Sequence, residues 1–176
     1  MQIKQLQIAY APEHDRILMR IHSGDNQEVR CWLTRRMVQM LVPSLNKMMQ
    51  DLLASDRPLS EEGRKALLNM NREAVLQHAN FQTPFQDELN NTPLGAEPLL
   101  ITHIELRSTH GNLPTELTLK LSTSNHKGFE MRMAEQLQHG FANLLLKACE
   151  QAQWGLAFIP MHTESVENGQ QPIVWN

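Results

Sequence analysis

The stretch that most constrains the fold is residues 28–53, where the spacing of the apolar residues changes from two to about 3.6. Up to Leu33 apolar and polar residues alternate, which predicts a strand with one buried face. After Thr34 apolar residues recur every three or four positions, which predicts an amphipathic helix. Thr34 suits the start of this helix, because its hydroxyl can accept a hydrogen bond from a first-turn amide.

The same pattern returns one hundred positions later in the chain. Three separate segments keep this offset, so chance is a weak explanation for it. The matched sets are Ile17, Met19 and Ile21 with Leu117, Leu119 and Leu121; Val29, Cys31 and Leu33 with Phe129, Met131 and Met133; and Met37, Leu41 and Leu45 with Leu137, Phe141 and Leu145. The sequence therefore predicts two strand–strand–strand–helix units, at about residues 2–54 and 99–155, related by pseudo-twofold symmetry.

The fold class that follows is α+β, with each unit an antiparallel meander covered on one face by its helix. We expect a single domain over residues 1–176, whose two sheets either join edge to edge or pack around the helices. An extra helix is predicted at about 60–79, with Ser60 as its cap and no counterpart in the other unit. The segments that remain are an irregular, apolar connection at 80–98, a strand at 99–106, and a tail at 156–176 that favours a hairpin.

Composition is typical of a soluble globular protein, with 176 residues of which 41% are hydrophobic and 20% charged. The net charge of −3 argues against a generally basic nucleic-acid binder. No signal-peptide pattern and no apolar run of membrane-spanning length are visible, so we expect a cytoplasmic protein with no membrane partner. Cys31 and Cys149 lie at apolar-patterned positions and are interpreted as reduced core residues.

Motifs that announce catalysis or metal binding are missing from the sequence. It contains no glycine-rich phosphate loop, no HExxH and no CxxC. None of its eight histidines lies within five residues of another, which is unlike the paired ligands of most zinc sites. We therefore predict no cofactor and no metal, and we favour a protein that is not an enzyme while leaving that class open.

The densest basic cluster surrounds the only aromatic residue of the strand at 28–34. Its members, which form the candidate binding site, are Arg16, Arg20, Arg30, Trp32, Arg35 and Arg36. Strand parity points Arg30 and Trp32 away from the core. Such a face suits a solvated surface with Arg–Glu28 pairs, a protein interface, or a platform for single-stranded nucleic acid. The second unit weakens the last alternative, because Arg132 has Glu130 beside it and no aromatic residue in place of Trp32.

The leading functional hypothesis is a non-enzymatic cytoplasmic binding or adaptor protein that forms a homo-oligomer or takes a protein partner. It would act through the outer sheet face or residues 81–98. The alternative is a single-stranded DNA- or RNA-binding protein that uses the face around Trp32, and an enzyme is the third. In topology alone, two meanders paired with helices resemble the Whirly family of single-strand binders. That resemblance carries no motif residue, and therefore implies no site.

Overall fold

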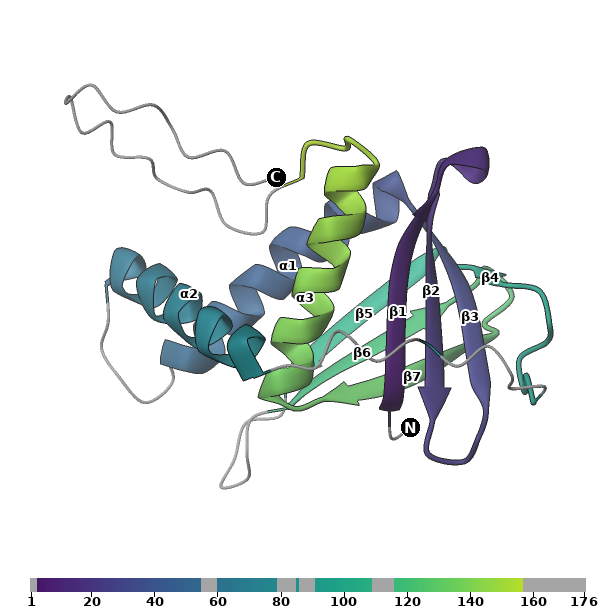
Figure 1. The fold of residues 1–176 in the computed structure, drawn as a ribbon, viewed down its shortest axis with the longest axis horizontal. Coiled ribbons are helices and arrows are strands. Elements are labelled where there is room, and N and C mark those ends of the chain that lie inside the picture. The colour runs from purple at the N-terminus through teal and green to yellow at the C-terminus, as the bar shows by residue number, and fades with distance from the viewer. Residues whose placement is uncertain (1–2, 55–59, 79–84, 86–90, 109–115, 157–176) are drawn as a thin grey trace.

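A computed structural model describes residues 3–54, 60–78, 85, 91–108 and 116–156, and these residues form an α+β fold with two sheets and three α-helices. The strand order is β1-β2-β3-β4 in the first sheet and β5-β6-β7 in the second (Figure 1). The strands are β1 Ile3–Ala11, β2 Arg16–Ser23, β3 Glu28–Thr34, β4 Leu99–Leu100, β5 His103–Ser108, β6 Leu117–Ser122 and β7 Gly128–Met133. The helices are α1 Arg35–Ala54, α2 Glu61–His78 and α3 Glu135–Gln151, with a short 3-10 turn, η1, at Pro12–His14.

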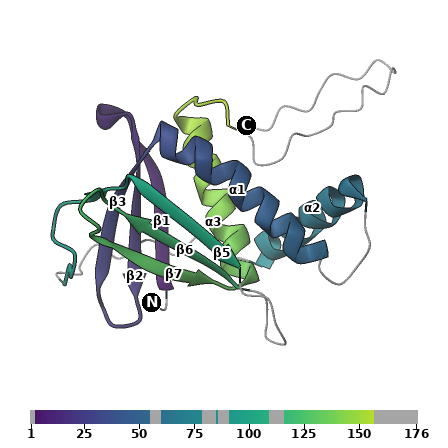
Figure 2. The same ribbon diagram turned by 180° about the vertical axis from the view of Figure 1, so that it is seen from behind.

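The two sheets lie one behind the other, with their strands crossing, and the helices stand along one side (Figures 1 and 2). Helix α3 packs against β1, whereas α1 packs against β5, so each helix contacts the first strand of the other meander. Helix α2 packs on both α1 and α3. One hydrophobic cluster joins both sheets to the helices, and the alternating residues of the predicted strands are its centre.

Local signals in the sequence placed the helix starts correctly. The Thr34 hydroxyl accepts a hydrogen bond from the Met37 amide at 3.3 Å, and α1 begins at the next residue. The Ser60 hydroxyl accepts one from the Gly63 amide at 3.1 Å, just before α2. Both residues therefore satisfy a first-turn donor that would otherwise lack a partner within the helix.

The single strand predicted at 99–106 is wrong, because this segment is divided between the two sheets. Leu99 and Leu100 form β4, which pairs in parallel with Cys31 and Trp32 of β3. Two residues later the chain enters β5, which pairs with β6 of the second sheet. The segment carries the chain directly from one sheet to the other, and Ile101 between them is buried whereas Leu100 is exposed.

The β2–β3 and β6–β7 hairpins share one register at an offset of one hundred. Ile17 pairs with Leu33, and Leu117 pairs with Met133. The turn residues Asn26 and His126 both adopt left-handed backbone conformations, with φ of 57° and 62°. Helices α1 and α3 begin at positions 35 and 135. The strands predicted within residues 157–176 lie outside the part of the chain that the structure describes.

Candidate functional site

The side chains of the first sheet that point away from the core form a surface that we call the outer face. Strand pairing arranges them in four rows: Gln5, His22 and Glu28; Gln7, Arg20 and Arg30; Ala9, Leu18, Trp32 and Leu100; and Ala11, Arg16 and Thr34. They alternate along the strands with core residues such as Met19 and Cys31, which are fully buried. The predicted outward direction of Arg30 and Trp32 is thus confirmed.

A buried carboxylate organises one half of the outer face. Arg20 and Arg30 lie directly opposite each other on β2 and β3, a pairing that is destabilising for like charges. Glu28, whose side chain is 0% exposed, separates them: its Oε1 lies 2.7 Å from Arg20 Nε and its Oε2 lies 2.7 Å from Arg30 Nη2. Burial disfavours the charge of Glu28, but hydrogen bonds from Arg30 and Arg20 outweigh it and lower its pKa to about 2.

Residues from the connection between α2 and β4 cover this half of the face. The ring of Phe85 lies 3.9 Å from that of His22, centroid to centroid, and Arg20 Cζ lies 4.4 Å from the Phe85 centroid. The Asn91 carbonyl accepts a hydrogen bond from the Glu28 amide at 2.8 Å. Residues 80–84 and 86–90 of the predicted connection lie outside the part of the chain that the structure describes. The covering explains why Glu28 and His22 are buried although they lie on an outward face.

The third row is apolar across all four strands, and we call Ala9, Leu18, Trp32 and Leu100 the apolar stripe. Leu100 is 41% exposed, Ala9 is exposed, and Leu18 and Trp32 are half-buried. The ring of His14, from the η1 turn, lies 4.9 Å from that of Trp32. Contiguous apolar surface of this kind is a common feature of protein interaction sites.

The remaining predicted site residues lie beyond the other side of the stripe. Arg16 is half-buried and pairs with Thr34 across the β2–β3 hairpin. Arg35 and Arg36 are exposed in the first turn of α1, and Arg35 Nη2 donates to the Trp154 carbonyl at 3.4 Å. The six predicted residues therefore share one region, and within the described part of the chain Arg20 and Arg30 have a common partner, Glu28.

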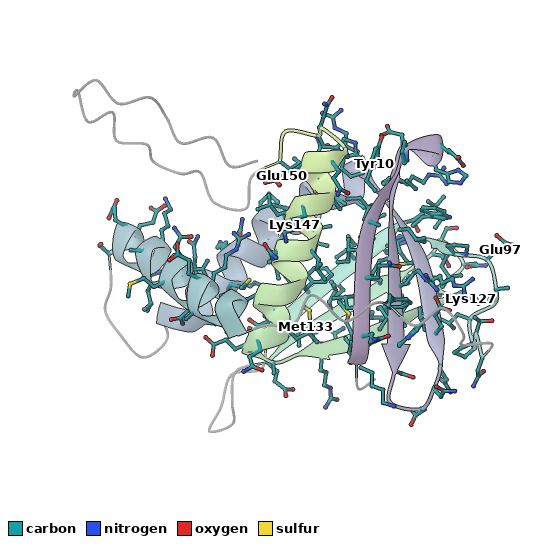
Figure 3. All side chains as sticks on the ribbon, viewed as in Figure 1. Tyr10, Glu97, Lys127, Met133, Lys147 and Glu150 are labelled. Atoms are coloured by element: carbon teal, nitrogen blue, oxygen red, sulfur yellow. The ribbon has the colours of Figure 1, made fainter. Side chains whose placement is uncertain are left out.

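A second polar contact ties β1 to the end of α3 at the edge of this region. The hydroxyl of Tyr10 donates to Asp15 Oδ1 at 3.0 Å, and Trp154 Nε1 donates to the same oxygen at 3.2 Å. The hydrogen bond to Asp15 raises the pKa of Tyr10. Figure 3 labels Tyr10 near the end of β1 and Glu150 near the end of α3. This contact fixes the η1 turn that carries His14 over Trp32.

The outward face of the second sheet differs in chemistry. Glu105 accepts hydrogen bonds from Arg107 on the same strand, and its Oε2 lies 3.6 Å from Lys120 Nζ. Arg107 lowers the pKa of Glu105, although this carboxylate is 46% exposed. This surface is a solvated set of exposed ion pairs, in contrast to the covered carboxylate and apolar stripe of the first sheet.

The described residues offer little for catalysis. Within them, no group of three or more His, Cys, Asp or Glu side chains is placed to hold a metal ion. Cys31 and Cys149 are buried and free, as predicted for their burial, and burial raises the pKa of each thiol. No helix in the described ranges is long and apolar enough to cross a membrane.

Comparison with known proteins finds no matching family, no matching curated protein and no matching solved structure. Function is accordingly inferred from the residues of this chain. Sequence reasoning singled out the outer face from its arginines and Trp32, but it missed Leu18, Leu100 and Phe85. The alternation in 16–23 places Leu18 on the outward face, and this signal was available; the position of Leu100 depends on the parallel pairing of β4.

Proposed function

We propose that the chain is a single-domain, cytoplasmic, non-enzymatic binding protein that takes a protein partner on its apolar stripe. The observation that carries this proposal is the unbroken row from Ala9 to Leu100, which offers an exposed leucine beside a half-buried tryptophan. Tryptophan is enriched among the residues that dominate protein–protein binding energy, and it acts best when neighbouring contacts exclude water. A partner segment with apolar side chains would bury this row.

The arginines beside the stripe support a protein partner over nucleic acid. A single-strand platform needs cations that can neutralise phosphates. Arg20 and Arg30 direct their guanidinium groups to Glu28, whose low pKa keeps it charged at neutral pH, so one carboxylate offsets one of their two charges. A single-stranded DNA or RNA ligand remains the second candidate, because Arg16 lies in the row next to Trp32.

A displayed library of random peptides tests the proposal with a defined probe. We expect the wild-type chain to select apolar peptides whose dissociation constant changes little with salt, and Leu100→Glu to weaken them at least tenfold. Met70→Glu is the matched control, because Met70 is an exposed apolar residue on α2, 67% exposed and away from the stripe. Equal peptide binding by wild type and Leu100→Glu would remove the stripe from consideration.

A parallel titration with fluorescent oligothymidine separates the two candidates. Binding to phosphates must fall steeply as salt rises, because counterions are released on association. Salt-dependent oligonucleotide binding that is lost in Leu100→Glu, without any peptide selection, would favour the nucleic-acid function instead.

We also propose that the two meander–helix units are an internal pseudo-symmetric repeat. Three observations support this repeat. The β2–β3 and β6–β7 hairpins share one register at an offset of one hundred, and their turns both contain a left-handed residue, Asn26 or His126. In addition, α1 packs on β5 and α3 packs on β1. The first hairpins fit with a two-residue adjustment, since Tyr10 pairs with Ile17 but Ser108 pairs with Leu117. Leu41 and Phe141 would then occupy equivalent places in the core.

A further inference from the structure

Strand β7 forms one edge of the second sheet, and within the described residues it pairs only with β6. Figure 2 shows it as the lower border of that sheet, and Figure 3 labels Lys127, the residue before the strand, and Met133, its last residue. The amide of Thr123 donates to the Lys127 carbonyl at 2.8 Å. This hydrogen bond identifies which residues of β7 bond to β6 and which do not. By antiparallel alternation, Phe129, Met131 and Met133 bond to β6, whereas Gly128, Glu130 and Arg132 direct their N–H and C=O groups outward.

The matching edge of the first sheet is covered by the chain itself. The Glu28 amide donates to Asn91, and the Trp32 carbonyl accepts from the Ile101 amide at 3.1 Å, beyond the two residues of β4. For β7, the described part of the chain supplies no comparable strand. Unpaired strand edges of this kind are templates for pairing with another chain, and proteins commonly protect them with charged side chains, especially lysine, or with proline.

The side chains on this edge are instead complementary to themselves. Glu130 and Arg132 are both exposed and lie on the same face, two residues apart. If two copies of β7 pair antiparallel about a twofold axis through Met131, Glu130 lies opposite the partner's Arg132, and Arg132 lies opposite the partner's Glu130. A twofold axis through Glu130 would instead set two carboxylates against each other, which is unfavourable.

We propose that β7 pairs antiparallel with β7 of a second copy, with the twofold axis at Met131. The backbone hydrogen bonds also fit this register. Glu130 and Arg132 direct their N–H and C=O groups outward, and in this register each lies opposite the other in the second copy, so the two can exchange hydrogen bonds. On the inner face, Phe129, which is half-buried, lies opposite the partner's Met133 and gains apolar cover. The contact joins two three-stranded sheets into one six-stranded sheet and is isologous, as expected of a closed dimer.

This surface is distinct from the apolar stripe, which belongs to the first sheet, so the dimer does not depend on the proposed function. Peptide binding on the stripe and the mass of the full chain are measured separately. If one of these two measurements contradicts its proposal, the other proposal is unaffected.

Sedimentation equilibrium of the full chain, as a function of concentration, is the test. The wild type is expected to be dimeric, and Glu130→Arg and Arg132→Glu are each expected to weaken the dimer at least tenfold, since each sets like charges opposite each other twice. The double variant Glu130→Arg/Arg132→Glu should restore it. Glu62→Arg, the same charge change at an exposed site on α2, is the control and should remain dimeric.

Mixing the two single variants gives the sharpest outcome. One chain then carries two arginines and the other two glutamates at positions 130 and 132, so the register predicts a heterodimer from two weakly associating variants. A monomeric wild type, single variants as dimeric as wild type, or a mixture that stays monomeric would each overturn the proposal. Thermal unfolding of every variant confirms folding, because both side chains are exposed and outside the core.

Discussion

Glu28→Gln tests whether the buried carboxylate of Glu28 stabilises the fold, as a solvated carboxylate would not. The change keeps the shape of the side chain and removes its charge, leaving Arg20 and Arg30 opposite each other. The lowering of the Glu28 pKa from 4.5 to about 2 corresponds to about 3 kcal/mol at pH 7. Removing one partner of a buried ion pair typically costs about 3–5 kcal/mol. Because the Arg20 and Arg30 side chains are 15% and 29% exposed, we expect the lower end of that range.

The pH dependence has a definite sign. A carboxylate whose pKa is lower in the folded state stabilises the fold above its unfolded pKa, near 4.5, and loses that contribution as the pH falls toward 2. Glutamine does not titrate. The difference in unfolding free energy between wild type and Glu28→Gln should therefore be full at pH 7, and less than about half of it should remain at pH 3.

Urea unfolding at pH 7, 5, 4 and 3 measures this difference, and a loss of about 3 kcal/mol lowers the midpoint by about 1–2 M. Glu105→Gln is the matched control, since Glu105 also contacts two cations on an outward sheet face but is 46% exposed; it should lower the urea midpoint much less than Glu28→Gln does. Equal effects of the two substitutions, or a Glu28 effect that does not shrink at low pH, would refute the buried-carboxylate account.

Two further predictions concern the core. Leu41→Ala and Phe141→Ala should each lower the free energy of unfolding by about 2–5 kcal/mol, because Leu41 is 2% exposed and Phe141 is fully buried; a loss below about half a kcal/mol for only one of them in urea unfolding would argue against equivalent positions. Cys31 should react with a thiol reagent only after denaturation, because burial excludes the reagent and raises the thiol pKa, and rapid labelling of the native protein would contradict this placement.

The sequence was most informative where structure depends on near neighbours. Alternation predicted the buried face of β2 and β3, and hydroxyl residues marked the starts of α1 and α2. It was least informative where distant segments meet. Glu28 is of a residue type that is usually solvated, and among the described residues Phe85 and Asn91, more than fifty positions away, cover its part of the outer face. The parallel pairing of β4 with β3 likewise depends on contacts that no local pattern encodes.

The residues at positions 28 and 128 give the two sheets different surfaces, which suits the two different partners proposed for them. At the position that matches Glu28, the second unit has Gly128, where an added Cβ would clash with the Leu121 carbonyl oxygen. The second sheet therefore cannot place an equivalent carboxylate between its hairpin strands. Among the described residues of the first sheet, the carboxylate and the β4 segment occupy the edge and half of the outer face, and the apolar stripe is the part that they do not cover. In the second sheet, β7 has no second strand beside it among the described residues. Glu130 and Arg132 give this edge the charge pattern that a second copy would fit.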